Sequence, residues 1–188
     1  MTARATDSLN RPRNHQCGPM LLVVVTAILL GATTLIGIAG FRINLTPSAA
    51  LGLWQILPRQ RSAKVGDRVF VCPPDTPVMR EAFARGYLRR GLCAAGMAPL
   101  IKSVAAVAGQ KVEIGTQVFI DGQPLLSSRP LPHDGSKRPL HPYQGGVVAL
   151  GAVYLHSEFP GSFDSRYFGP LSTDTILGLA QEIWTYAP

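Results

Sequence analysis

Lys102 is the residue whose position in the sequence most strongly suggests chemistry. It lies inside an apolar run, Leu-Ile-Lys-Ser-Val at 100–104. If the amine is buried there, desolvation disfavours its charged form, and its pKa falls by roughly 2–3 units, equivalent to about 3–4 kcal/mol. A neutral amine at pH 7 can serve as general base for a serine nucleophile, because Ser/Lys pairs are known variants of the serine triad. The local sequence by itself favours a plainer alternative, a lysine at a strand end whose amine reaches solvent.

Two other stretches combine hydroxyl and charged side chains. Asn-Leu-Thr-Pro-Ser occupies 44–48, and Gly-Ser-Phe-Asp-Ser-Arg-Tyr-Phe-Gly-Pro occupies 161–170. The sequence has no G-x-S-x-G elbow, H-E-x-x-H zinc motif, S-x-x-K motif or Gly-rich phosphate loop. The histidines follow no recognisable triad pattern, and no His/Cys cluster has zinc-site spacing. The residues that could carry chemistry are therefore Lys102 and these two stretches, without support from any of these motifs.

The elements that must position these residues begin with an apolar segment. The run 19–41 contains 23 residues without a charged side chain, and roughly 20 are enough to cross a bilayer as a helix. The preceding tail carries three arginines against one aspartate, so we expect it to stay cytoplasmic while the rest is exported. A secretory signal peptide cleaved after Gly-Ile-Ala at 37–39 is the alternative. Both interpretations place the remainder of the chain in the same compartment.

The composition supports a folded exported part. Of 188 residues, 46% are hydrophobic and 15% are charged, which excludes disorder as the overall description. We expect a cytoplasmic tail at 1–18, a transmembrane anchor at 19–41 and an exported domain at 42–188, with a helical insertion at 75–99.

Within the exported part the pattern predicts a β-rich, mainly antiparallel fold. Short strands are expected at the positions 56–58, 65–72, 100–107, 111–114, 116–120 and 147–155. Asp121-Gly122 predicts a type I′ hairpin, because both central residues of that turn need positive φ. The proline-rich stretch 127–144 is expected to be a surface loop, and 175–180 a final helical turn. No β-α alternation supports a parallel sheet.

The basic residues are mostly scattered, and the net charge is +7. One cluster, Arg80, Arg85, Arg89 and Arg90, falls in a short helix expected at 78–90. It is either a solvated helix face or a contact for anionic lipid or an acidic partner. Nothing interleaves aromatic and basic residues as in nucleic-acid-binding proteins, so no nucleic acid is expected as a partner.

Cys72 and Cys93 both lie in the part expected to be exported, where disulfides persist. A bridge between them would close a loop of about 20 residues and stabilise the fold by about 3 kcal/mol. The alternative is two buried thiols. Cys17 precedes the apolar run and is expected on the reducing side.

Together, the motifs resemble the S26 signal peptidases, and within them the conjugative-transfer branch of TraF-type pilin-processing peptidases. The resemblance covers nearly the whole chain. The run 44–48 is similar to the serine box, 102–112 to the lysine box and 65–69 to the Gly-Asp strand entry. The most specific match is Asp-Ser-Arg-Tyr-Phe-Gly-Pro at 164–170. The sequence departs from the branch at Ala50, where proline is usual, and lacks the Gly-Asp-Asn run before the last box.

The resemblance implies a Ser/Lys dyad that needs no metal or cofactor. Ser48 would be the nucleophile and Lys102 the general base, with Ser162 orienting the amine. The Thr46 hydroxyl and the Ser48 backbone N–H would form the oxyanion hole. Asp164 and Arg166, which both lie in the last of the matching motifs (the last box, 162–170), would form an ion pair with a structural role.

The resemblance also implies the substrate and the location. The substrate would be a membrane-inserted pilin precursor of a plasmid conjugation system, cut beside the inner membrane on the periplasmic side, with other conjugation components as further partners. Some family members also join the new ends into a circle. The alternatives are a general type I signal peptidase and a catalytically inactive scaffold of the conjugation apparatus.

Overall fold

The computed structural model describes residues 17–187, and the chain forms two compact units, 1–39 and 40–188. In the first unit, helix α1 spans Cys17–Ile38. Its stretch Pro19–Ile38 is long and apolar enough to cross a membrane, a property that anchors and signal sequences share. The helix ends before the expected boundary at residue 41, because Gly40 adopts a φ of +84° and Phe41 begins a strand. Most of the tail expected at 1–18 lies outside the described residues.

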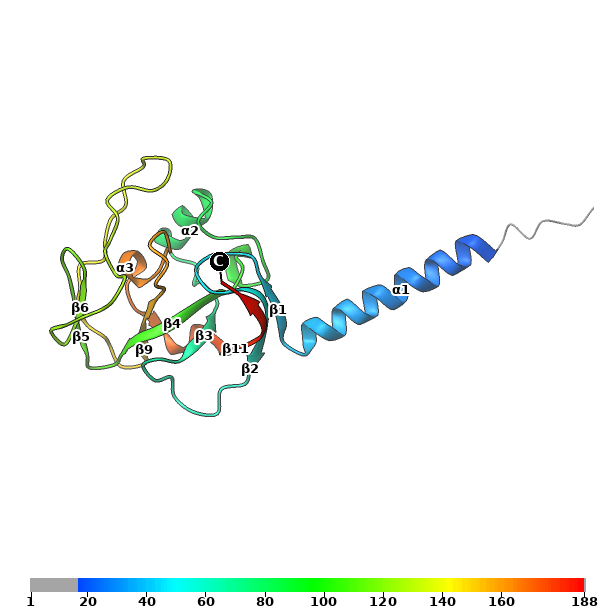
Figure 1. Cartoon of the computed structure of the whole chain (residues 1–188), viewed down its shortest axis with the longest axis horizontal. Helices are drawn as coiled ribbons and strands as arrows, with labels where there is room; N and C mark the ends of the chain where they lie inside the picture. Colours follow the sequence, from blue (N-terminus) through cyan, green and yellow to red (C-terminus); the bar gives the residue numbers. More distant parts are fainter. Residues whose placement is uncertain (1–16, 188) are drawn as a thin grey trace, which may run out of the picture. The chain divides into compact units, whose positions relative to one another are not determined.

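The second unit is built from two antiparallel sheets and few helices (Figure 1). The larger sheet has seven strands in the order β1-β2-β11-β3-β4-β9-β10. These strands are β1 (Phe41–Asn44), β2 (Leu51–Leu57), β3 (Arg68–Val71), β4 (Leu100–Val107), β9 (Ala152–His156), β10 (Leu171–Ser172) and β11 (Ile176–Tyr186). The smaller sheet, in the order β7-β6-β5-β8, consists of β5 (Lys111–Ile114), β6 (Val118–Ile120), β7 (Gln123–Pro124) and β8 (Gly146–Val147). The β-rich, antiparallel architecture expected from the sequence is confirmed.

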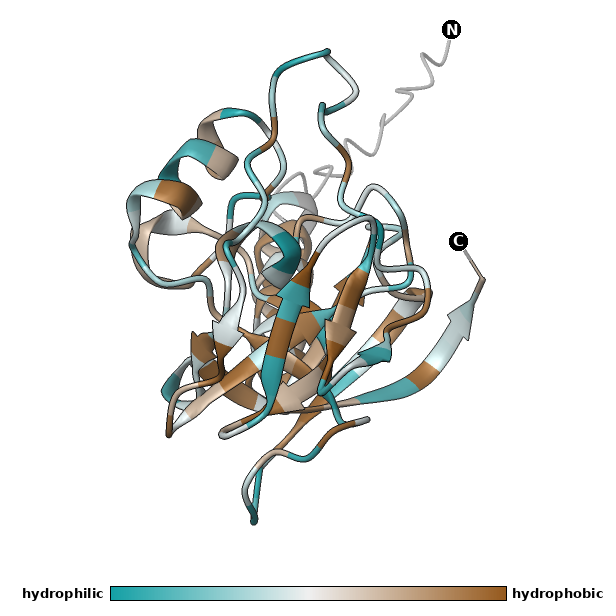
Figure 2. Ribbon diagram, turned by 90° about the vertical axis from the view of Figure 1, so that its left-hand side faces the viewer, coloured by the Kyte–Doolittle hydropathy of each residue, from teal (hydrophilic) through white to brown (hydrophobic). Residues whose placement is uncertain are grey.

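Hydrophobic residues gather along the strands, as the brown segments of Figure 2 show. Alternate residues of the central strands point into one core, where Val69 of β3 and Val104 of β4 are almost fully buried. Helix α2 (Pro77–Ala84) covers part of this core with Met79. The core therefore holds β4, the strand that carries Lys102, in the interior of the large sheet between β3 and β9.

Helix α2 begins and ends where local chemistry requires. Thr76 accepts a bond from the Met79 N–H, and Pro77 starts the helix where no backbone donor is needed. The helix stops at Ala84 instead of reaching the expected residue 90, and Gly86 follows with a φ of +82°. Three short helical segments complete the inventory of the described residues: α3 (Ser165–Phe168), η1 (Ala94–Gly96) and η2 (Thr173–Thr175).

A disulfide ties the helical insertion to the large sheet. Cys72, directly after β3, is bonded to Cys93, and their Cα atoms lie 5.5 Å apart. The bond closes the chain segment that contains α2. Both ends of that segment are therefore fixed to the sheet next to β3.

The hairpin expected at Asp121-Gly122 is present between β6 and β7, with φ of 50° and 78° at its two residues. Two other expectations are wrong. Of the helical turn expected at 175–180, Thr175 ends η2 and the rest belongs to β11, because pairing with β2 and β3 on both sides overrides the weak local preference. The single strand expected at 147–155 is two strands in different sheets, β8 and β9, separated by a turn with Gly151 at φ +74°.

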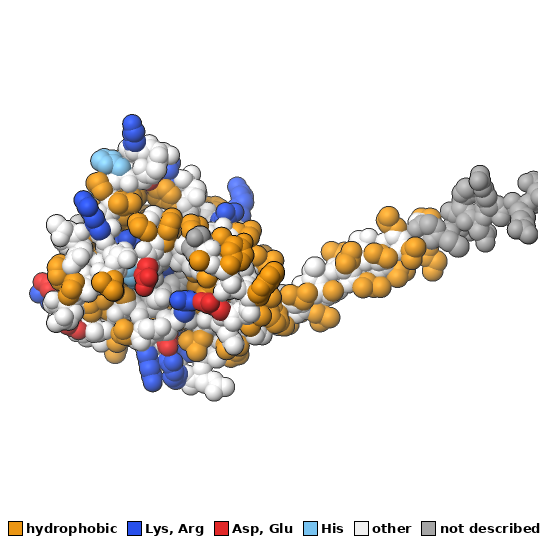
Figure 3. Space-filling view, viewed as in Figure 1, with side chains coloured by type: hydrophobic (Ala, Val, Ile, Leu, Met, Phe, Trp, Pro, Cys, Tyr) orange, Lys and Arg blue, Asp and Glu red, His pale blue; other side chains and the backbone are white. Residues whose placement is uncertain are grey.

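Basic side chains are dispersed over the face of the second unit seen in Figure 3, instead of forming one continuous patch there. Apolar side chains cover the visible side of α1. The distribution on this face agrees with the scattered lysines and arginines of the sequence.

Candidate active site

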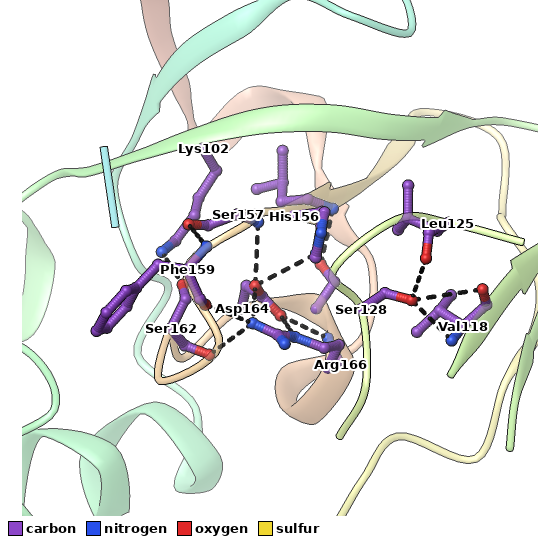
Figure 4. Close-up of polar contacts among 12 residues, drawn as sticks. Lys102, Val118, Leu125, Ser128, His156, Ser157, Phe159, Ser162, Asp164 and Arg166 are labelled. Carbon is purple, nitrogen blue, oxygen red and sulfur yellow. Dashed lines mark hydrogen bonds and ion pairs between the residues drawn. The ribbon is translucent and has the colours of Figure 1, made fainter. Parts of the chain in front are cut away.

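Lys102 is buried, not solvated. Its side chain is 3% exposed, and its Nζ lies 2.6 Å from Ser162 Oγ, as Figure 4 shows. Burial lowers the pKa of Lys102 from 10.5 to about 8; the Asp164 carboxylate opposes this change and the Arg166 guanidinium adds to it. The alternative of a lysine reaching solvent is therefore excluded. With this pKa about a tenth of the amine is neutral at pH 7 and about half at pH 8, which supplies the neutral form that a general base requires.

Ser48 lies on the loop between β1 and β2, and Asn44 at the end of β1 shapes this loop. The Asn44 amide Nδ2 donates to the carbonyl oxygens of Thr46, Ala49 and Ala50 at 2.9–3.0 Å. Its Oδ1 accepts from the Thr46 N–H at 3.1 Å and the Thr46 hydroxyl at 2.7 Å. One side chain thus satisfies five backbone or hydroxyl groups and holds the backbone on both sides of Ser48.

A second contact fixes the loop from the opposite direction. Ser157, directly after β9, donates its hydroxyl to the Ser48 carbonyl oxygen at 2.7 Å. The Ser157 N–H in turn donates to Asp164 at 3.1 Å. The loop that carries Ser48 is therefore connected through Ser157 to the last sequence box.

Ser48 and Lys102 line the same groove, a cavity of about 670 Å³ that Ser162 also borders. From the resemblance we expect Ser48 Oγ and Lys102 Nζ to lie within hydrogen-bond reach, or somewhat farther apart without substrate. In the part of the chain that the structure describes, no hydrogen bond joins the two. Ser48 Oγ lies 3.4 Å from Thr46 Oγ1, while the Lys102 amine donates to Ser162. Such bonds are often long or absent without substrate and tighten when it binds.

Asp164 and Arg166 form a bidentate ion pair with both side chains fully buried. Arg166 Nε and Nη2 donate to the two Asp164 oxygens at 2.8 Å each. Nη2 also donates to the carbonyl oxygens of Ser162 at 3.1 Å and Phe159 at 3.3 Å. The pair therefore fixes the backbone that presents Ser162 to Lys102.

Electrostatics at the ion pair favour its charged form. Burial raises the pKa of Asp164, but the neighbouring His156 and Arg166 outweigh burial and hold that pKa below its ordinary value. His156 is itself buried, with Nδ1 3.6 Å from an Asp164 oxygen (Figure 4). The carboxylate thus stays ionised and paired close to Lys102.

The structure brings together every residue that the sequence assigned to the dyad and its support. Sequence reasoning missed Ser157 and the central role of Asn44. Ser157 belongs to His-Ser-Glu-Phe at 156–159, which stands where the family's Gly-Asp-Asn run is absent, so no motif drew attention to it. Asn44 was visible only as the first residue of the serine box.

Comparison with known proteins decides the family. Residues 16–185 match the family described as "Signal peptidase, peptidase S26". The chain belongs to the S26 signal peptidase family. This membership confirms the resemblance expected from the serine, lysine and last boxes, and it agrees with the β-rich fold.

Several relatives within the S26 family carry names from plasmid transfer. The chain is 54% identical over 178 residues to "Probable conjugal transfer protein TraF" of Sinorhizobium fredii, covering 94% of this chain and 95% of that protein. It is 48% identical over 167 residues to "Conjugal transfer protein TraF" of Agrobacterium fabrum, covering 89% and 95%. It is 33% identical over 171 residues to "Plasmid transfer protein TraF" of Escherichia coli, covering 89% and 94%.

Proposed function

We propose that the chain is a membrane-bound serine endopeptidase that processes the pilin precursor of a plasmid conjugation system. The observation that carries the proposal is the buried, hydroxyl-bonded amine of Lys102 in the groove that also contains Ser48. Burial of Lys102 costs free energy and lowers its pKa to about 8. The use of the neutral amine as a base gives a reason for that cost.

The proposed reaction follows from the hydrogen-bond arrangement. The neutral Lys102 amine donates one N–H to Ser162 Oγ, which leaves its lone pair free to accept the Ser48 proton. Ser48 Oγ then attacks the scissile carbonyl, and the Lys102 ammonium gives the proton to the leaving amine. Water attacks the resulting ester with the same amine as base and restores the enzyme.

The oxyanion would be bound by the Ser48 backbone N–H and the Thr46 hydroxyl. In the substrate-free groove the Thr46 hydroxyl donates to Asn44 Oδ1, so it must rotate toward the oxyanion when the tetrahedral intermediate forms. A donor of this kind is worth about 3–4 kcal/mol in the transition state. Thr46 therefore belongs to the proposed oxyanion hole only as a mobile hydroxyl.

The substrate is proposed to bind as an extended strand. Residues 100–102 of β4 pair with β3, whereas the described pairing of β4 with β9 starts at Ser103. β1 is an edge strand whose described pairing is with β2 alone. Both free edges border the groove, so a peptide can add backbone hydrogen bonds there while small side chains enter the pockets.

The conjugation role is supported by the names of the plasmid-transfer relatives. The proposed location is the inner membrane, with α1 as anchor and the domain at 42–188, including its insertion at 75–99, in the periplasm. Ser48 follows the end of α1 by ten residues, so a membrane-inserted substrate suits the site. A circular product would form if the pilin amine, instead of water, attacked the acyl-enzyme; the new amide replaces the ester and Ser48 regains its proton.

The test is cleavage of pilin precursors from the same plasmid, in membranes, by the full chain and by Ser48→Ala. We expect wild-type protein to release products whose masses define one cut, and Ser48→Ala to release none. A product one water lighter than the linear one would show cyclisation. Equal cleavage of unrelated secretory precursors would favour a general signal peptidase. No cleavage of any precursor would refute the proposal and favour an inactive scaffold.

A further inference from the structure

The groove beside Ser48 has an unbalanced charge. The basic residues among those bordering it are Arg42, Arg89, Arg90 and Lys102. Among the described residues that line this groove, none is an aspartate or glutamate. The proposed endopeptidase reaction uses Lys102 alone, so the arginine side chains need another explanation.

Arg89 and Arg90 differ from the other arginines of the same cluster. Arg80 is paired with Asp75 at 2.6 Å, and Arg85 binds Glu81 and a backbone carbonyl. Within residues 17–187, Arg89 has no ion pair, and the Arg90 guanidinium has only the Phe83 ring, 5.8 Å away. The cluster therefore divides into two arginines that stabilise the domain and two that face the groove with their charge uncompensated.

The backbone that carries these two arginines is well fixed although their side chains are exposed. The Ala98 N–H donates to the Arg89 carbonyl oxygen at 2.8 Å, and Arg90 forms a β-bridge with Met97. Cys93, three residues farther along, is bonded to Cys72 beside β3. The backbone that carries the two guanidinium groups is therefore fixed before a ligand binds, which reduces the conformational entropy lost on binding.

The position of Arg89 can be related to the cut. It pairs with Ala98, which lies four residues before Lys102 along the segment that enters β4. Four residues of extended chain span at most about 14 Å. A peptide lying along the free edge of β4 with its scissile bond at Ser48 and Lys102 would therefore pass Arg89 about three to five residues from that bond.

We propose that Arg89 and Arg90 bind a carboxylate of the substrate, three to five residues from the scissile bond. Guanidinium groups match carboxylates in a bidentate fork and are the usual choice for such recognition. The carboxylate is either a Glu or Asp side chain or the free carboxyl terminus of a substrate cut near its end. This inference rests on the proposed function, because it assigns the substrate chemistry of the same groove.

The test measures peptide binding and cleavage separately. The probes are fluorescent alanine- and serine-rich peptides with an Ala-Ala-Ala core. In one series a single Glu is placed at successive positions, and each peptide is compared with the peptide that has Gln at the same position. A second pair of peptides differs only in having a free or an amidated carboxyl terminus. The full chain is solubilised in detergent and carries Ser48→Ala, so that it binds the peptides without cutting them. Binding is measured by the fluorescence anisotropy of the peptides. The Arg89→Gln/Arg90→Gln variant is compared with Arg80→Gln, a matched loss of charge outside the groove.

We expect one Glu position, or the free terminus, to bind about three- to tenfold more tightly than its neutral partner, with a preference that weakens as salt is raised. Arg89→Gln/Arg90→Gln should abolish this preference and Arg80→Gln should keep it. Equal binding of charged and neutral peptides, or no binding of either, overturns the proposal and leaves anionic lipid as the ligand of these arginines. A preference that survives Arg89→Gln/Arg90→Gln overturns it as well.

Cleavage by the wild-type chain distinguishes this inference from the proposed function. If the wild-type chain cleaves no peptide but the binding preference for the carboxylate is present, the proposed endopeptidase activity is refuted and a peptide-binding groove remains. Ser48-dependent cleavage without any charge preference would refute the role of Arg89 and Arg90 alone.

Discussion

The pKa of Lys102 sets how the activity should depend on pH. With a pKa of about 8, about 9% of the amine is neutral at pH 7, about half at pH 8 and about 90% at pH 9. We therefore expect kcat/KM for pilin-precursor cleavage to rise about fivefold from pH 7 to 8 and about twofold from pH 8 to 9, and then to level off. An ordinary lysine would give about a tenfold rise for each pH unit through pH 9.

The assay is cleavage by purified protein across pH 6–10, with initial rates at low substrate concentration. Lys102→Arg is the companion variant, because a guanidinium does not lose its proton in proteins. We expect it to be inactive at every pH. Retained cleavage by Lys102→Arg, or a rate that keeps climbing through pH 9.5, would refute Lys102 as a base with a depressed pKa.

The same burial has a cost in stability that Lys102→Met should reveal. The pKa of Lys102 is lower in the folded chain, so the unfolded chain binds more protons between pH 8 and 10.5, and stability rises with pH across that window. Below pH 8 the full penalty of about 3 kcal/mol applies. After subtracting about 1 kcal/mol for the lost bond to Ser162, we expect Lys102→Met to be more stable at pH 7 by about 2 kcal/mol, or roughly 4–8 °C in Tm. A difference that stays constant from pH 7 to 10 would contradict this reasoning.

Three further changes test the groups that hold the site. Asn44→Ala should lower kcat about a hundredfold with little change in KM, because it releases the Ser48 loop from its backbone contacts; an unchanged kcat would show that the loop holds itself. Asp164→Ala should destabilise the domain by about 3–5 kcal/mol in thermal unfolding, because it leaves the buried guanidinium of Arg166 unpaired; a fully stable but inactive variant would point to a chemical role instead. Replacing Cys72 and Cys93 by serine should cost about 3 kcal/mol, and equal Tm values with and without reductant in the wild type would contradict this.

The site could be predicted from the sequence where its residues lie in local motifs. Ser48, Lys102 and Ser162 each fall in one of the family's sequence motifs. The order of these motifs along the chain is what made the three residues predictable. Whether Lys102 is buried could not be derived from its neighbours alone, because that depends on strands β3 and β9 flanking β4. The hydroxyl of Ser157 that holds the Ser48 loop is 109 residues away in sequence, and no local pattern encodes such a contact.

The fold shows the same division between local and long-range information. The hairpin at Asp121-Gly122 was predictable because its turn chemistry is contained in two residues. The helical turn expected at 175–180 was wrong, since β11 is stabilised by partners more than a hundred residues earlier in the chain. Local preference therefore fails where distant pairing supplies most of the stability.

The place of β11 in the large sheet has a consequence for how the groove is assembled. This strand lies between β2, which follows the Ser48 loop, and β3, which pairs with the strand that carries Lys102. Among the described strands, β11 is the one that joins the β1–β2 pair to the rest of the large sheet. The two walls of the groove that carry Ser48 and Lys102 therefore take their positions in the sheet only when residues 176–186 have paired with both neighbours.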